Sequence, residues 1–461
     1  MSAIILSAIW GVIMMFGGVL FQKRSTPKYV AIAGIITILI ANILELTGRR
    51  LFHIDLKGMF AFDNFTLIFN CVALGSTLLY FLLSGRDIEK VSKNVSEHFA
   101  LIFFVLCGVA ISSSYKTLLM LFLGIEIMSI PLYILTGSDK KNLKSNEAAL
   151  KYFLMGAFST GIMLMGIAFI YGGNRLGSFS LDYIQLGLGS MQPMIAVGLL
   201  MILVAMSFKV SAAPFHFWTP DVYDGAPTVF TSFMATIVKV AGFIAFLRLF
   251  QTSFGRMHAE WQGMVVFITA STLIIGNITA VFQQSVKRML AYSSIAQAGF
   301  MMLALFALND TAKEGLLLYA AAYSVASIGL FAVLIRMHDY TIEGFNGLGK
   351  TQPVLALCAT LFLLSLTGIP LTAGFTAKFY MLLAAVKQGH QFWLVILAVV
   401  CAAISAYYYF RVIQAMYFKP ANNDAPAMEV SGSFKALLVI SAAIIIVLGV
   451  LPSILIDWIY Y

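Results

Sequence analysis

Charged residues are scarce in this chain, and the shortage limits the class of protein it can be. Asp, Glu, Lys and Arg make up only 11% of the 461 residues, whereas soluble domains contain about 25%. Hydrophobic residues reach 61%, and runs of about 18 mostly apolar residues recur along the chain. The composition therefore excludes an ordinary soluble domain and predicts an all-α polytopic membrane protein. In such a protein the net charge of +9 indicates basic loops rather than a nucleic-acid partner.

Cysteines are also few, and none has a partner close by in the sequence. All four lie singly inside apolar segments, at Cys71, Cys107, Cys358 and Cys401. Without a CxxC pair or a Cys/His cluster, we expect no iron–sulfur cluster, zinc site or disulfide. Residues 344–351 match the P-loop pattern, but no strand precedes them, and the motif needs one. We therefore expect this chain to bind no metal and no cofactor of its own.

Long apolar segments are what the chain has in abundance. About 14 of them are long enough to cross a hydrocarbon core of about 30 Å, so we expect about 14 transmembrane helices. They lie at about residues 3–21, 29–47, 64–83, 98–114, 116–136, 147–171, 193–217, 226–250, 262–283, 288–308, 312–336, 353–386, 391–417 and 433–459. Connections after odd-numbered segments hold about 16 Lys and Arg, and those after even-numbered segments about 9, which predicts cytoplasmic odd-numbered connections and periplasmic termini.

Two of these helices, the seventh and the twelfth, are expected to be interrupted. Pro214 falls in segment 193–217, and Pro370 and Gly374 fall in segment 353–386; proline removes a backbone donor and breaks a helix. The segments that open at residues 147–152 and 314–319 resemble each other, and each stands one helix before an interrupted one. This pattern predicts two inverted five-helix repeats, as in many transporters.

Four ionisable residues lie near the middle of predicted spans: Glu126, Lys209, Lys239 and Lys378. Each costs about 2.5–3.5 kcal/mol to insert at the bilayer centre, so a use for them is expected. A structural ion pair between Glu126 and Lys209 is one explanation, but one glutamate cannot neutralise three lysines. The other is a proton relay, because desolvation lowers the pKa of a buried lysine and a nearby carboxylate raises it. Arginine could not serve, since it stays protonated.

Three further residues are candidates for an auxiliary proton path. Glu147 and Lys151 are spaced i, i+4, which suits a helical ion pair, and their place at a cytoplasmic helix start also suits proton entry. His216 follows the break at Pro214. It could bridge lysines through water or be an ordinary histidine near the membrane interface. The sequence leaves both alternatives open for each site.

The segment around the first break resembles a known signature. Residues 208–227, FKVSAAPFHFWTPDVYDGAP, look like that of the antiporter-like membrane subunits of respiratory complex I, the proton-pumping NADH:quinone oxidoreductase. The form PDVYxGAP is closest to the bacterial subunit N branch, the counterpart of mitochondrial subunit 2. Further similarity lies at residues 123–126, 147–153, 290–294 and 368–378, so the resemblance covers nearly the whole chain.

The resemblance implies a division of labour along the chain. Glu126 is expected to pair with Lys209, Lys239 to link two halves, and Lys378 to serve the exit. The expected parts are a three-helix segment (1–97), a first repeat with the entry half-channel (98–250), a second repeat with the exit half-channel (262–417) and a C-terminal helix (433–461).

The resemblance also implies partners and a location. NADH, FMN, iron–sulfur clusters and quinone are expected in partner subunits, and other membrane-arm subunits and the lipid bilayer are the expected contacts, in the bacterial inner membrane. Two rival functions stay open. One is a large subunit of a multi-subunit Na⁺/H⁺ antiporter, and the other is a structural subunit with an inactive channel.

Overall fold

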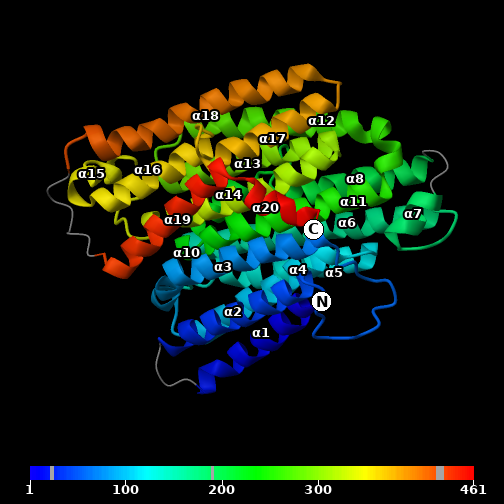
Figure 1. Cartoon of the computed structure of the whole chain (residues 1–461), viewed down its shortest axis with the longest axis horizontal. Helices are drawn as coiled ribbons and strands as arrows, with labels where there is room; N and C mark the ends of the chain where they lie inside the picture. The colour runs from blue at the N-terminus through cyan, green and yellow to red at the C-terminus, as the bar shows by residue number, and fades with distance from the viewer. Residues whose placement is uncertain (21–24, 188–191, 422–429, 461) are drawn as a thin grey trace.

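The computed structural model describes residues 1–20, 25–187, 192–421 and 430–460, and over these residues it contains helices and isolated β-bridges but no strands. Twelve of its helices are long and apolar enough to cross a membrane, and Figure 1 shows the long helices running side by side. The all-α, multi-pass class predicted from composition is therefore confirmed.

The spanning helices are, in chain order, α1 (Ser2–Leu20), α2 (Thr26–Leu46), α3 (Asn64–Val91), α4 (Val95–Ser114), α5 (Leu118–Thr136), α6 (Leu143–Gly173), α10 (Thr228–Phe233) continued by the π-helical turn η1 (Met234–Val238) and α11 (Lys239–Ser253), η2 (Gly255–Met257) continued by α12 (His258–Val281), α13 (Val286–Ala307), α14 (Asp310–Leu334), α18 (Phe392–Phe418) and α19 (Gly432–Val450). The shorter helices are α7 (Leu181–Gly187), α8 (Pro193–Lys209), α9 (Trp218–Gly225), η3 (Glu343–Phe345), α15 (Leu348–Thr351), α16 (Pro353–Thr367), α17 (Ala373–Lys387), α20 (Ser453–Ile456) and η4 (Asp457–Ile459).

The seventh and twelfth expected spans are interrupted, as predicted. Helix α8 ends before Pro214 and α9 begins after it, while Pro370 lies between α16 and α17. Gly374 differs slightly from expectation, because it is already the second residue of α17. The described residues contain twelve candidate spans besides these two interrupted helices, and the total of about 14 spans stays a prediction. The inverted repeats, and the division at residues 97, 250, 262, 417 and 433, stay predictions, and Tyr461 lies outside the described residues.

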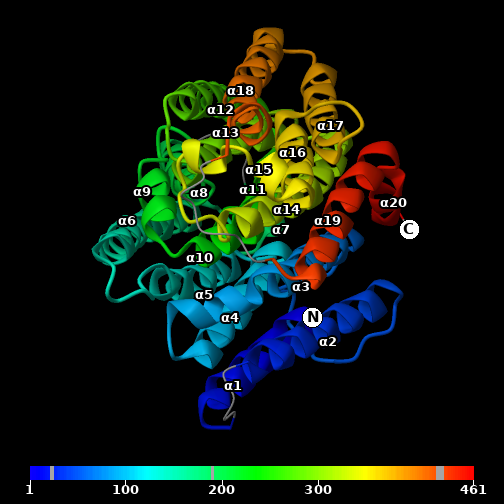
Figure 2. The same cartoon turned by 90° about the vertical axis from the view of Figure 1, so that its left-hand side faces the viewer.

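The two helices α13 and α14 form the centre of the bundle. Nearly every residue of their spanning windows is buried, whereas α1, α2 and α18 lie at the periphery (Figure 2). Large apolar side chains on the peripheral helices, such as Phe16 and Phe392, are exposed. That pattern is expected where lipid rather than water covers the surface, because lipid tails and apolar side chains are equally apolar. Polar side chains in the middle of α13 or α14 are therefore far from both lipid and bulk water.

Candidate functional site

Glu126 lies on α5 and Lys209 at the end of α8, and no ion pair joins these two described side chains. The Lys209 ammonium donates to Ser129 Oγ at 2.7 Å and lies 6.0 Å from the ring centre of Tyr133. Glu126, Ser129 and Tyr133 are spaced i, i+3, i+7 and so share one face of α5. Over the described residues no ion pair joins Glu126 to Lys209, and Oε1 of Glu126 is buried without a hydrogen-bond partner. In this conformation Ser129 accepts from the ammonium, and the expected pairing of Lys209 with Glu126 stays a prediction.

Lys209 is the last residue of α8, so it stands where the first interrupted helix opens. The backbone groups left without helical partners at this break form hydrogen bonds with other parts of the chain. The Trp218 indole N–H donates to the carbonyl of Phe208 at 3.0 Å, and the amide of Ala213 donates to Thr272 Oγ1 at 2.8 Å. Broken backbone at membrane depth needs such partners, because no water is there to supply them. The opening is thus held by α9 and α12.

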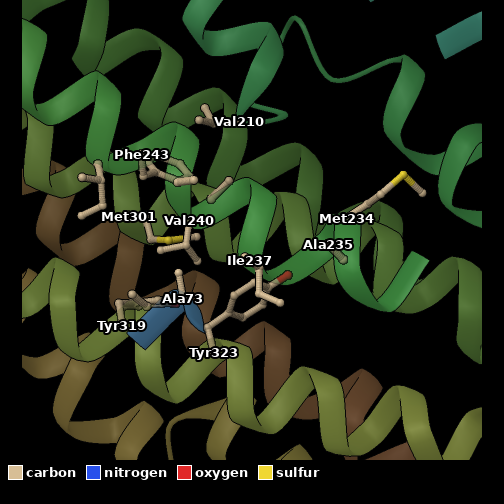
Figure 3. Packing of buried hydrophobic residues seen from close by; sticks show 14 of the residues in the cluster. Ala73, Val210, Met234, Ala235, Ile237, Val240, Phe243, Met301, Tyr319 and Tyr323 are labelled. Carbon is tan, nitrogen blue, oxygen red and sulfur yellow. The ribbon is translucent and has the colours of Figure 1, made fainter. Parts of the chain in front are cut away.

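Lys239 is the first residue of α11 and is only 2% exposed. It follows the π-helical turn η1, whose residues Met234, Ala235 and Ile237 pack among apolar side chains, with Tyr323 beside them (Figure 3). Its ammonium donates to the carbonyl oxygen and Oγ of Ser294 at 3.0 and 2.8 Å. A π-turn inside a helix marks functional sites in many proteins. Here it precedes the buried amine directly.

Lys378 closes the second interrupted helix. Helix α16 ends at Thr367, and the Lys378 ammonium donates to the carbonyls of Leu366 and Thr367, both at 2.9 Å. The side chain is 5% exposed, and its ammonium lies 4.5 Å from the ring centre of Phe300. A helix end carries free carbonyls and partial negative charge, which a cation stabilises. Lys378 is thus both a buried amine and the cap of a broken helix.

A polar track on α13 joins Lys239 to Lys378. Ser294 accepts from Lys239, and one turn further along Gln297 donates to the Leu366 carbonyl, which also accepts from Lys378. Tyr319 donates to Gln297 Oε1, and Tyr409 bonds to Gln297 and to Ser293. Sequence reasoning missed Gln297, Tyr319 and Tyr409, although Ser294 lay in a quoted motif. The sequence feature that could have pointed to them is a polar residue within a long apolar segment.

A small cavity lies beside this track. It is lined by Gln297, Tyr319, Tyr323, Ser365 and Lys378, and it measures about 10 Å³. That is near the minimum that holds one water molecule, and its polar lining supplies the partners that a buried water needs.

A second cluster of charges, the Asp221 cluster, lies where α6, α9 and α13 meet. Lys151 pairs with Glu147 at 2.7 Å and with Asp221 at 2.9 Å, so the i, i+4 pair expected from the sequence is confirmed. Asp221 also accepts from Arg288 at 3.1 Å. These residues line a cavity of about 230 Å³. Asp221 was not among the expected site residues, yet it is the link between Lys151 and Arg288.

Lys287 is buried, contrary to expectation, and within the described residues His216 is buried without a hydrogen bond to Lys209 or Lys239. Lys287 counted as a loop charge, but it is 5% exposed and donates to the carbonyls of Asp224 and Ala226 at the end of α9, both at 2.7 Å. His216 is buried in the first break and stacks on Phe217 with ring centres 4.8 Å apart. Lys209 and Lys239 donate elsewhere. A bridging role for His216 stays a prediction.

A row of aromatic rings separates the surroundings of Lys209 from those of Lys239. The neighbouring ring centres are 4.7, 4.7 and 5.8 Å apart along the series Tyr133, Tyr152, Trp218 and Tyr223. The last ring lies 5.7 Å from the Lys239 ammonium. The hydroxyls of Tyr133 and Ser207 are buried without partners among the described residues.

Replacing Asp221 by asparagine tests the Asp221 cluster. The change keeps the shape but removes the carboxylate that holds Lys151 and Arg288 together, so we expect proton uptake by membrane vesicles to slow severalfold. Stability should change by less than about 1 kcal/mol, because the pairs are partly exposed. Asp224→Asn is the matched control, since Asp224 lines the same cavity but lies 3.9 Å from Arg288, and over the described residues no ion pair joins it to Lys151. Equal rates in both variants would remove Asp221 from the path.

Comparisons with known proteins agree over nearly the whole chain. A family model described as "NADH:quinone oxidoreductase/Mrp antiporter, TM" matches residues 116–405. The chain is 38% identical to NADH-quinone oxidoreductase subunit N of Trichlorobacter lovleyi, over 99% of this chain and 95% of the relative. It is 39% identical to the subunit N of Cytophaga hutchinsonii, over 99% of each.

Solved structures give the same picture. A chain of respiratory complex I from Thermus thermophilus, solved with bound aureothin, superposes with a TM-score of 0.85 at 31% identity and 99% coverage of both chains. A chain of the Mrp complex from a Dietzia species superposes with a TM-score of 0.84, over 99% of this chain and 96% of that one, but at 18% identity. The second likeness therefore concerns the fold alone.

Proposed function

The chain belongs to the family of NADH:quinone oxidoreductase and Mrp antiporter transmembrane subunits, and from this membership we propose how it moves protons. It is a proton-translocating membrane-arm subunit of NADH:quinone oxidoreductase, respiratory complex I, and it works among other membrane-arm subunits. The path runs through its buried amines. Its main support is the polar track on α13, where Ser294 accepts from Lys239 and, one turn further along, Gln297 shares the Leu366 carbonyl with Lys378.

Proton entry is assigned to the Asp221 cluster, where Glu147 and Lys151 line a cavity with Asp221. From there a proton reaches Lys209. In the described conformation the Lys209 ammonium rests on Ser129, with Glu126 on the same face of α5. A small rotation of the lysine would exchange Ser129 for the carboxylate. Because a nearby anion favours the ammonium form, making and breaking that contact would load and release the proton.

The second half of the path starts at Lys239. A proton released there passes along Ser294 and Gln297 to Lys378, with Tyr319 and Tyr409 holding Gln297 in place. Hydroxyl and amide groups transfer a proton only through a bound water molecule or by reorienting between transfers. The cavity beside Lys378 has room for one water. Lys378 then releases the proton to the exit side.

Redox chemistry is assigned to partner subunits, which would hold NADH, FMN, the iron–sulfur clusters and quinone. The cysteines of this chain are all free and stand apart from one another. We place the chain in the bacterial inner membrane with both termini periplasmic. Loop charge supports this orientation, and in Figure 1 the ends of α1 and α20 that carry the chain termini point the same way.

Glutamine in place of Glu126 tests the entry half of the path. Glu126→Gln keeps the size of the side chain but removes its charge, so Lys209 loses the anion that favours loading. We expect NADH-driven proton uptake through this chain to slow about tenfold, which corresponds to about 1.4 kcal/mol in the barrier. Uptake is measured in inverted membrane vesicles by the quenching of a pH-sensitive dye, with the assembled complex quantified on native gels.

The control for this variant is Glu260→Gln, which removes an exposed glutamate on α12. Wild-type uptake in the Glu126 variant, with normal assembly, would favour the structural-subunit alternative. Adding sodium to vesicles without NADH separates the antiporter alternative, because only a Na⁺/H⁺ exchanger would then shift the internal pH. The comparisons favour complex I, since identity reaches 38–39% with subunit N and 18% with the Mrp chain.

A further inference from the structure

A cavity of about 450 Å³ lies away from the proton path, between α2, α3, the end of α14 and α19. In Figure 2 these helices meet on the side of the bundle opposite to α6 and α9. Four chain segments reach the same membrane surface here. Helix α2 begins, α3 ends, α14 ends and α19 begins within a few residues of the cavity lining. The cavity therefore sits at the level where apolar helix gives way to polar loop.

The outer part of this cavity is strongly cationic. Lys28, Arg86, Lys90 and Arg336 all line it, and Asp87 is the one acidic residue in its lining. Asp87 pairs with Arg336 at 2.7 Å and with Lys90 at 2.9 Å. Over the described residues neither Lys28 nor Arg86 has an ion-pair partner. The cavity thus holds an excess of positive charge that its own side chains leave uncompensated.

Lys28 is the most telling of these cations, because it is only 9% exposed. Its aliphatic stem packs against α3, where a Cβ on Gly85 would lie 3.2 Å from it. Burying a lysine beside an arginine is costly unless an anion joins them. Asp87 and Glu89 lie near enough to Lys28 to favour its charge, but over the described residues no carboxylate forms an ion pair with it. The arrangement is one that a negatively charged ligand would complete.

The inner part of the cavity is apolar and leads toward lipid. Ile32, Leu82, Leu83 and Leu437 line it. Further along the same two helices, α2 exposes Ile36 and Ile40, and α19 exposes Val439 and Ile440. A ligand seated in the cavity would therefore meet cations with one end and an apolar, membrane-facing surface with the other.

From this arrangement we propose that the cavity binds one anionic phospholipid. The phosphate lies between Lys28, Arg86 and Lys90, and the acyl chains run down the apolar surface of α2 and α19. Basic pockets between transmembrane helices at the cytoplasmic surface are typical sites for anionic lipid headgroups. Free phosphate would use the cations but leave the apolar wall bare. An acidic protein segment would have no acyl chains to lay on α2 and α19.

The bound lipid would connect α19 to α2 and α3. Helix α19 packs on α14 and α16 but makes few contacts with α3, and Arg336 already lies 4.8 Å from the ring centre of Phe434 at its start. The lipid would fill the space left between these helices.

Photo-labelling of the intact purified complex tests the proposal. The probes are photoactivatable phosphatidylglycerol and, for comparison, photoactivatable phosphatidylcholine, each added in mixed detergent micelles. Peptides of α2 and α19 are then examined by mass spectrometry. We expect phosphatidylglycerol to label both helices and phosphatidylcholine to label them on the order of a hundredfold less, because each of the three basic residues contributes about 1 kcal/mol to anionic-lipid binding.

Arg86→Gln with Lys90→Gln should lower phosphatidylglycerol labelling about thirtyfold, and both side chains are exposed enough for the fold to tolerate the change. Ser433→Asp, which places a negative charge at the exposed rim, should lower it without removing any cation. Lys140→Gln with Lys141→Gln is the matched control, since it removes two cations from another loop. Each variant is first shown to assemble and to oxidise NADH.

Four results would overturn the proposal. The first is equal labelling by the two lipids, and the second is labelling that both cavity variants leave unchanged. The third is complete loss of labelling with excess inorganic phosphate, which would make the cavity an anion site rather than a lipid site. Absence of labelling in the wild-type complex would also overturn it, because a neighbouring protein segment would then fill the cavity.

Discussion

Replacing Lys239 by methionine is expected to stop proton passage through this chain. Methionine has nearly the length of lysine and suits a site that is 2% exposed, but it can neither carry a proton nor donate to Ser294. A proton would then have to cross the apolar packing around η1 without a carrier, at a cost of several kcal/mol. Passage should slow at least about a hundredfold. The number of protons moved per NADH oxidised should fall by the whole contribution of this subunit.

The measurement compares proton uptake with NADH oxidation in the same vesicles, and native gels report assembly. Assembly should be preserved, because replacing a buried charge by an apolar side chain of similar volume is often neutral for stability. Lys313→Met is the matched control, since Lys313 is partly exposed and pairs with Asp310 at 3.3 Å. An unchanged proton-to-NADH ratio in the assembled Lys239 variant would refute the relay, and the polar track on α13 would then be structural.

Alanine at Gly374 is expected to disrupt the fold around the second interrupted helix. Gly374 lies so close to α16 that an added Cβ would overlap the carbonyl oxygen of Ser365, and its amide donates to Ser365 Oγ at 3.1 Å. The obstacle is backbone, which cannot rotate away as a side chain would. Overpacking of this kind typically costs about 1–3 kcal/mol, and more where the backbone must move. We expect a loss at or above the upper end of that range.

The effect is measured as the amount of intact complex in the membrane and as its thermal stability in detergent. Gly75→Ala in α3 is the control, because no atom lies within 4 Å of the added Cβ and alanine favours a helix by up to about 1 kcal/mol over glycine. Alanine should therefore lower the stability at position 374 and leave it equal or higher at position 75. Wild-type stability of the Gly374 variant would mean that α17 can shift away from α16 at little cost.

The sequence predicted the features that follow from single residues. A proline in an apolar segment breaks a helix whatever surrounds it, so both interruptions could be located before the structure was known. The buried lysines stood out because charge is costly in lipid. The i, i+4 pair of Glu147 and Lys151 needed only helical geometry.

Features that depend on two distant segments could not be predicted. The contact of Lys209 with Ser129 rather than Glu126 depends on which turn of α5 faces α8, and periodicity does not fix that rotation. The α13 track, with Gln297 bonded to Tyr319 and Tyr409, joins three helices whose packing order is unknown from one sequence. Lys287 was taken for a loop charge because its carbonyl partners, at the end of α9, lie 61 and 63 positions away. The π-turn at η1 has no clear signature in the sequence.

One consequence concerns the amine that closes the second broken helix. The charged Lys378 ammonium donates hydrogen bonds to the free carbonyls of Leu366 and Thr367 at the end of α16. The neutral amine would bind these carbonyls more weakly, because it lacks the charge. Thermodynamic reciprocity then requires that pulling α16 and α17 apart weakens the hold on the proton by the same free energy. A displacement of α16 from α17 by a neighbouring subunit would then favour release of the proton, because the amine would lose the partial negative charge of those carbonyls. The separation of α16 from α17 and the loss of one proton from Lys378 would thus be coupled.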